Sequence, residues 1–189
     1  IYAQTKKDQE DMVLNIGRTY DLPSIALRYF NAYGPRQSLS NPYTGVMAIF
    51  LSRLKNDHTP VIYEDGLQTR DFVSVHDIVQ ANMLALEKSE ADYESFNVAS
   101  GNPVTIREIA EGTAQLLGKD IAPDITMKFR KGDIRHCIGD ISKIQDRLGF
   151  APKVSFEDGM KEIIEWSHEA EAKDLFDDAS KELRKKGLM

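Results

Sequence analysis

The stretch Ser24–Arg36, which reads SIALRYFNAYGPR, is the part of this chain that decides its fold class. Its first six residues predict a short strand, and the Gly, Pro, Ser and Asn residues over 31–43 predict a loop after it. A helix is expected before the strand over Tyr2–Tyr20, because its apolar residues recur at helical spacing. Pro23 ends that helix, since proline disfavours helix in the residue before it.

The rest of the chain continues this alternation of helices and strands. Helices are expected at Gly45–Asn56, His76–Glu87, Thr105–Leu117, Ser142–Leu148 and Ser155–Ala172, and extended segments at Pro60–Tyr63, Asp71–Val75, Ser95–Val98 and Ile125–Phe129. The tail Lys173–Met189 is highly charged and reads as a solvated helix or a frayed end. The alternation predicts an α/β or mixed fold. The chain contains no G-x-G-x-x-G dinucleotide fingerprint, which argues against a complete nucleotide-binding domain.

Composition excludes several classes of protein. The 189 residues carry a net charge of −6, which disfavours a nucleic-acid binder. The longest apolar run, Val46–Leu51, is far too short to cross a membrane, so no membrane partner is expected. The single cysteine, Cys137, has no partner for an internal disulfide, and four scattered histidines support no metal site. Together with a polar, charged start, these features suggest a cytoplasmic protein.

Tyr2 and Lys6 form the first candidate for chemistry. Their spacing of i, i+4 puts them on one face of the predicted helix. An ammonium close to a phenol favours its deprotonated form, so such a pair can exchange a proton with a substrate hydroxyl while hydride moves to a nicotinamide. The alternative is an ordinary surface pair, because the chain has seven tyrosines.

Four motifs in a fixed order give this pair its context. They are Tyr-x-x-x-Lys at 2–6 leading into Arg28–Pro35 (RYFNAYGP), Gly66–Asp77 (GLQTRDFVSVHD), Phe96–Gly101 (FNVASG), and Arg130–Arg135 (RKGDIR) with Asp140–Lys143 (DISK). In this order they make the chain similar to the extended short-chain dehydrogenase/reductase family, in its nucleotide-sugar epimerase and dehydratase branch. The similarity runs from Tyr2 to Trp166.

The resemblance implies a fold and a cofactor. It implies the C-terminal part of a Rossmann-like parallel sheet with a smaller mixed α/β substrate-binding domain. Residues 1–43, with 71–100 returning to them, would belong to the NAD-binding domain, residues 44–70 and 101–172 would form the substrate domain, and 173–189 a charged tail. Tyr2 would be the catalytic acid and base, Lys6 would hold the nicotinamide ribose, and Phe30 would lie near the nicotinamide of NAD.

The resemblance also implies a nucleotide-diphosphate sugar, with dTDP or UDP, as the substrate. Its contacts would come from Asn31, from Thr44, Gly45 and Val46 at a helix start, from Val61, Ile62 and Tyr63 around the base, and from Arg70, Arg130, Asp133 and Arg135. Helix starts attract anions, and guanidinium groups suit pyrophosphate. Each has a structural alternative: Asn31 could cap a turn, Phe30 and Tyr63 could be core residues, and the arginines could pair with nearby carboxylates.

The reaction implied is a 4-epimerisation, in which the sugar C4 hydroxyl is transiently oxidised and then reduced on the other face. The stretches 35–45 and 61–70 look most similar to the dTDP-L-rhamnose 4-epimerase and UDP-glucose 4-epimerase group. A 4,6-dehydratase, a reductase or decarboxylase of the same superfamily, or a non-catalytic nucleotide-sugar-binding module are the alternatives.

In the family's order, the glycine fingerprint and the triad Ser or Thr precede the Tyr-x-x-x-Lys motif, and this chain starts with Ile1 beside that motif. We therefore expect this polypeptide alone to bind NAD weakly and to be nearly inactive. We also expect the strand at Ser24–Tyr29 to have an exposed apolar edge that favours self-association. The resemblance implies a homodimer for the complete enzyme.

Overall fold

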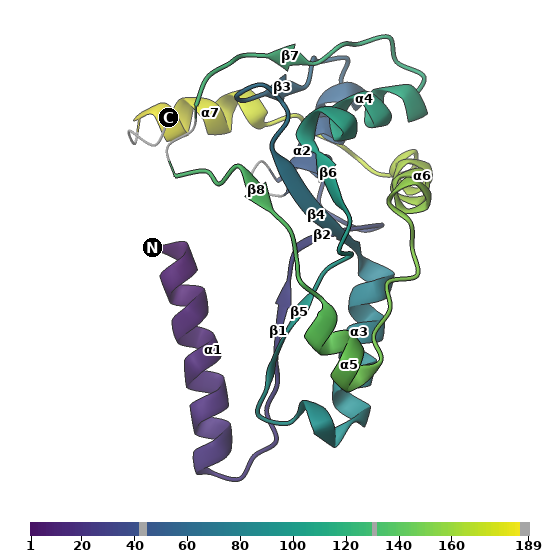
Figure 1. Cartoon of the computed structure of the whole chain (residues 1–189). Coiled ribbons are helices and arrows are strands. Elements are labelled where there is room, and N and C mark those ends of the chain that lie inside the picture. Colours follow the sequence, from purple (N-terminus) through teal and green to yellow (C-terminus); the bar gives the residue numbers. More distant parts are fainter. Residues whose placement is uncertain (42–44, 130–131, 186–189) are drawn as a thin grey trace.

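The computed structural model describes residues 1–41, 45–129 and 132–185, and it confirms an α/β fold (Figure 1). The helices are α1 (Tyr2–Thr19), α2 (Val46–Lys55), α3 (Val75–Glu87), the short η1 (Ser89–Ala91), α4 (Ile106–Leu116), α5 (Ser142–Leu148), α6 (Phe156–Ser167) and α7 (Phe176–Lys185). The strands are β1 (Ala26–Tyr29), β2 (Asn31–Tyr33), β3 (Val61–Ile62), β4 (Thr69–Ser74), β5 (Ser95–Val98), β6 (Pro103–Thr105), β7 (Asp124–Ile125) and β8 (His136–Cys137).

Strand β4 is the centre of the topology. Its second half pairs in parallel with β2, while its first half lies between antiparallel β6 and parallel β8. Strands β1 and β5 form a separate parallel pair, in which Ala26 faces Ser95 and Tyr29 faces Val98. Strands β3 and β7 form a third, parallel pair. Because parallel neighbours run in one direction, the carboxyl ends of β1 and β5 lie at the same edge.

Two hydrophobic clusters meet at β4. Phe72 packs into a cluster with α2, α4 and α6, whereas the next residue, Val73, packs into a cluster with α3, β5 and α5. Successive side chains of a strand point to opposite faces, so one strand can serve both clusters. In Figure 1, α3 and α5 lie on the far side of the β1–β5 pair from α1.

Local capping signals set most helix boundaries as expected. Thr105 and Glu108 form a reciprocal capping box at the start of α4, and the Ser155 hydroxyl accepts from the amide of Asp158 at the start of α6. Gly149 ends α5 with φ of 65°, a left-handed conformation that suits glycine.

Three short strands were not expected from the sequence. β2, β6 and β8 have two or three residues each, and each exists because it pairs with β4. Residues 31–33 were expected to be loop, since such short segments carry little propensity of their own. Helix α6 also ends at Ser167 instead of Ala172, where Lys55 of α2 donates to the carbonyl oxygens of Ser167 and Ala170.

The charged tail is docked where it begins, in contrast to the expected solvated or frayed end. The Asp174 side chain is only 6% exposed and accepts from Arg53, and the Arg53 guanidinium lies 4.7 Å from the centre of the Phe176 ring. The backbone amide of Lys173 donates to the Ser40 hydroxyl. The segment before α7 is therefore part of the packed structure.

Within the described residues, no helix combines the length and apolar character needed to cross a membrane. The same part of the chain has no group of three or more His, Cys, Asp or Glu side chains arranged for a metal ion.

Candidate active site

An open groove of about 1140 Å³ lies between α1 and the strand β1 that follows it. Four residues singled out from the sequence line this groove: Tyr2 and Lys6 from α1, and Phe30 and Asn31 from the end of β1 and the start of β2. Figure 1 shows α1 standing beside the β1–β5 pair. The groove thus brings together residues from the start of the chain and from the β1–β2 junction.

Three contacts fasten α1 beside β1. Glu10 accepts two hydrogen bonds from the Arg28 guanidinium, at 2.6 Å from Nε and 2.5 Å from Nη2. These bonds lower the pKa of the Glu10 carboxyl below its usual 4.5. Arg18 donates to the Tyr93 carbonyl oxygen. Gly17 lies so close to the turn that a Cβ there would be 2.3 Å from the Ser24 hydroxyl oxygen, so only glycine fits.

Tyr2 and Lys6 share the groove face of α1, as their spacing predicts. The Lys6 ammonium lies 5.8 Å from the centre of the Tyr2 ring and 3.3 Å from the Gln9 side-chain oxygen. Tyr2 is 75% exposed, so its hydroxyl can be reached from the groove. Both side chains of the predicted pair therefore line one groove.

The groove runs along the whole of β1, from Ile25 to Asn31, and includes Asn97 of β5, so it reaches the carboxyl ends of both strands. The amide of Phe30 donates to the Val98 carbonyl oxygen, which continues the parallel pairing one residue beyond β1. Ligands of open parallel sheets bind at this edge. Asn97 and Cys137 also line the groove and were not predicted. Asn97 lies within the F-N-V motif, which was the available signal, whereas Cys137 had none.

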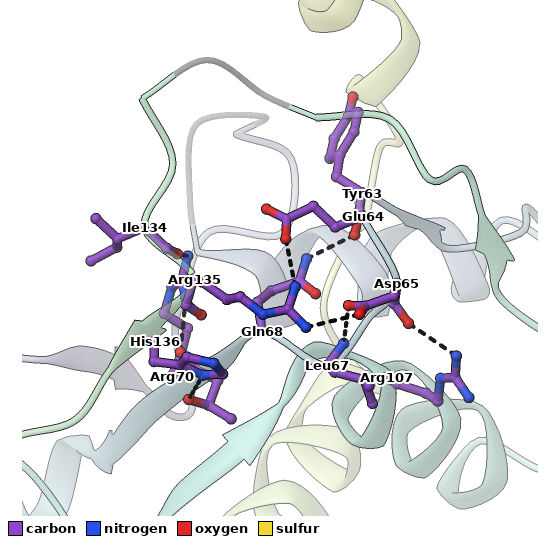
Figure 2. Close-up of polar contacts among 11 residues, drawn as sticks. Tyr63, Glu64, Asp65, Leu67, Gln68, Arg70, Arg107, Ile134, Arg135 and His136 are labelled. Atoms are coloured by element: carbon purple, nitrogen blue, oxygen red, sulfur yellow. Dashed lines mark hydrogen bonds and ion pairs between the residues drawn. The ribbon is translucent and has the colours of Figure 1, made fainter.

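A second polar cluster lies around the turn after β3 (Figure 2). The Arg135 guanidinium lies between two carboxylates, 2.8 Å from Glu64 and 2.8 Å from Asp65. Hydrogen bonds from Arg135 and from the amide of Leu67 lower the pKa of Asp65 from 3.8 to about 2. Arg70 instead donates to three carbonyl oxygens, those of Thr69, Ile134 and Arg135.

Arg70 and Arg135 do not line the groove that contains Tyr2 and Lys6. Strand β8 connects the two places, since Arg70 pairs in register with Cys137, whose side chain lines the groove. The structural alternative for Arg135, a pair with nearby carboxylates, is what the structure contains.

The remaining predicted residues lie around these two places. Gly45 is the exposed N-cap of α2 and Val46 is its first residue, while Val61 and Ile62 form β3, with Ile62 fully buried in the core. The Tyr63 ring points away from Arg135 in Figure 2, and Gln68 donates to its carbonyl oxygen. Asp133 is exposed. Thr44 and Arg130 lie outside the described residues.

Comparison with known proteins places this geometry in context. The family model described as GDP-mannose 4,6-dehydratase matches residues 1–163. The dTDP-L-rhamnose 4-epimerase of Burkholderia thailandensis is 36% identical over 167 residues, which are 88% of this chain and 46% of that protein. The chain thus spans about half the length of the curated relatives it matches.

Solved structures agree with this match. A UDP-N-acetylglucosamine 4-epimerase from Methanobrevibacter ruminantium, in complex with UDP-N-acetylmuramic acid, superposes with a TM-score of 0.80 at 38% identity, over 87% of this chain and 52% of that one. The UDP-glucose 4-epimerase of Thermus thermophilus, in complex with NAD, superposes with a TM-score of 0.79 at 31% identity, over 90% of this chain and 54% of that one.

Proposed function

This chain belongs to the GDP-mannose 4,6-dehydratase family, within the nucleotide-sugar epimerases and dehydratases of the short-chain dehydrogenase/reductase type, and on that premise we propose that it is the C-terminal portion of an NAD-dependent nucleotide-sugar 4-epimerase. The substrate is a dTDP- or UDP-hexose. Residues 1–43 and 71–100 belong to the cofactor side, and residues 44–70 and 101–172 to the substrate side. The complete enzyme is a homodimer.

The observation that carries the proposal is the groove shared by Tyr2, Lys6, Phe30 and Asn31. A tyrosine and a lysine one helical turn apart face the carboxyl ends of two parallel strands. This combination supports redox chemistry on a hydroxyl group, because the phenol can take up and return the hydroxyl proton.

The residues present fit a nicotinamide cofactor. The groove is large, the aromatic Phe30 is in its wall, and the exposed Lys6 ammonium has donors left for ribose hydroxyls beyond its bond to Gln9. Bound NAD would supply the acceptor and donor of hydride at the sugar carbon. Tyr2 would hold the proton of the C4 hydroxyl, and Lys6 would orient the ribose and keep a positive charge beside the phenol.

The nucleotide-sugar contacts form the second part of the proposal. Asn31 in the groove would hydrogen-bond the sugar or its phosphates, and Gly45 and Val46 would present backbone N–H groups at the start of α2. Val61, Ile62 and Tyr63 would surround the base. Arg70, Arg135 and Asp133 would bind the diphosphate and ribose, with the diphosphate competing with Glu64 and Asp65 for Arg135. Thr44 and Arg130 stay sequence-based members of this set.

The experiment joins this chain to the N-terminal half of the Burkholderia thailandensis 4-epimerase, ending where the similarity begins, and assays the chimera for C4 epimerisation of dTDP- and UDP-hexoses with NAD. We expect turnover, and a loss of kcat in Tyr2→Phe of about 100-fold or more. Tyr20→Phe, at the C-cap of the same helix and not lining the groove, is the matched control and should leave kcat unchanged. A folded chimera that binds NAD and sugar nucleotide without reaction at C4 would contradict the proposal.

The family model's own description favours a 4,6-dehydratase as the second candidate. The same assay separates the two, because a dehydratase releases a 4-keto-6-deoxy product instead of the C4 epimer. Binding of UDP or dTDP by this chain, with no turnover in the chimera and no effect of NAD, would instead favour a nucleotide-sugar-binding module.

A further inference from the structure

Asp71, in β4, is a fully buried carboxylate that the proposed chemistry does not use. One carboxylate oxygen, Oδ1, accepts from the amide and the hydroxyl of Ser100, both at 2.7 Å. The other, Oδ2, accepts from the amide of Gly101 at 2.9 Å and from the amide of Gly139 at 3.1 Å. These four donors come from two segments that are far from β4 in sequence.

Burying a carboxylate costs free energy unless it is compensated. Here all four donors are neutral groups, and three of them are backbone amides that need an acceptor. The carboxylate therefore accepts hydrogen bonds from the loop after β5 and from the segment after β8 at the same time. Removing it would leave the buried N–H of Gly139 and the partly buried N–H of Ser100 without their acceptor.

The two segments joined by Asp71 directly follow strands that line the groove, since Asn97 of β5 and Cys137 of β8 are in its lining. Gly139 is buried against Ala99 and Phe30: a Cβ at this glycine would lie 2.3 Å from the Ala99 Cβ and 3.2 Å from the Phe30 ring. Asn97, which lines the groove, donates to the carbonyl oxygen of Asp140 at 3.0 Å. The backbone around Gly139 thus sets how far the Phe30 ring can move.

We propose that Asp71 is a positioning residue for the candidate active site: its carboxylate holds the segment 137–140 against the carboxyl ends of β1 and β5 and so fixes Phe30 and Cys137 in the groove wall. Only the identity of what the groove binds rests on the proposed function. The positioning role itself concerns contacts within this chain and can be tested without cofactor or substrate.

Cys137 is the reporter, because it is the only cysteine of the chain, is half-buried and lines the groove two residues before Gly139. The experiment measures the rate at which a thiol reagent labels Cys137 in the full chain, at a temperature well below the unfolding midpoint of every variant. Asp71→Asn keeps the shape of the side chain, but its amide nitrogen would face the N–H groups of Gly101 and Gly139. We expect this variant to label about fivefold faster or more.

Asp77→Asn is the matched control. Asp77 is also a buried carboxylate, 2% exposed, and accepts from the amides of Lys153 and Val154, away from the groove. We expect it to lose thermal stability to a similar degree while its Cys137 labels within about twofold of the unmodified chain. An equal acceleration in both variants would show a general loosening and overturn the proposal, as would a folded Asp71→Asn chain with an unchanged rate.

Ser100→Ala keeps the test decisive if Asp71→Asn does not fold. It removes one of the four donors, and Ser100→Thr restores a hydroxyl at the same position. Faster labelling in the alanine variant that the threonine variant reverses supports the positioning role, and identical rates in both overturn it. An NADH titration of the chimera described above separates the two proposals: absent binding there contradicts the cofactor assignment, while the labelling rates of this chain still decide the role of Asp71.

Discussion

Arg53 Nη1 lies 3.2 Å from Asp174 Oδ2, and both side chains are less than a tenth exposed although one is in α2 and the other precedes α7. Asp174 also accepts from His58 at 2.6 Å and from the amide of Phe176 at 3.0 Å. The Arg53 guanidinium also donates to the Thr59 carbonyl oxygen and lies 3.5 Å from Asp177, whose side chain is exposed. This buried pair fixes the start of the C-terminal segment to the domain.

Replacing Asp174 should therefore destabilise the whole domain and not only the tail. In Asp174→Ala, the buried Arg53 loses its main counter-charge, which costs about 3 kcal/mol in the free energy of unfolding by urea. The control is Asp178→Ala, whose side chain is 77% exposed in a pair with Lys181, and we expect a change below about 0.5 kcal/mol. Equal, small effects of the two variants would mean that the Arg53–Asp174 pair adds nothing to the free energy of unfolding.

The carboxyl group of Asp65 should titrate at low pH. Its pKa is lowered from 3.8 to about 2, so its contribution to stability is present above pH 3.8 and is lost as the pH falls through 2. In Arg135→Gln the pKa should rise toward 3.8 but stay below it, because the amide of Leu67 still donates to the carboxylate. The carbon-13 chemical shift of the Asp65 carboxyl group, followed against pH, measures both values, and an unchanged titration in the variant would contradict the assignment.

Helix α1 should depend on the Glu10–Arg28 pair for its position beside β1. We expect Glu10→Gln to speed amide hydrogen exchange across α1 more than in the rest of the chain, because the paired charge is lost. Since the Glu10 pKa is lowered, this contribution is present above pH 4.5 and is lost as the pH falls below that value. Glu157→Gln, in the exposed pair with Lys161 on α6, is the control and should leave exchange in α1 unchanged.

Gly159 should be irreplaceable for a steric reason. A Cβ there would lie 2.1 Å from the Tyr33 hydroxyl oxygen and 2.7 Å from two ring atoms, so Gly159→Ala should lower stability by about 1–3 kcal/mol. Adding Tyr33→Phe should recover part of that loss, because it removes the closest atom.

Gly112→Ala, in α4, is the matched control. A Cβ at Gly112 would lie 3.3 Å from the flexible end of the Met160 side chain, which can move away. Thermal unfolding compares the stability of the unmodified chain, Gly159→Ala, Gly159→Ala with Tyr33→Phe, and Gly112→Ala. If the two alanine variants are equally stable, Tyr33 does not restrict α6 in this way.

Signals that act within one turn or one short segment were readable from the sequence. The capping box at Thr105, the stop at Gly149 and the shared face of Tyr2 and Lys6 each depend on residues a few positions apart, and each agrees with the structure. The four ordered motifs also indicate the family from the sequence alone.

Only the tertiary structure decided which distant segments meet. Strand β4 pairs with β2, β6 and β8, and Asp71 accepts hydrogen bonds from two distant segments. Arg53 forms an ion pair with Asp174, which precedes α7. No local sequence pattern identifies any of these partners. The same holds for the groove, because Cys137 reaches it through its pairing with β4. Local propensity is a property of a few neighbouring residues, whereas a buried charge or a two-residue strand is stable only when packing supplies its partner.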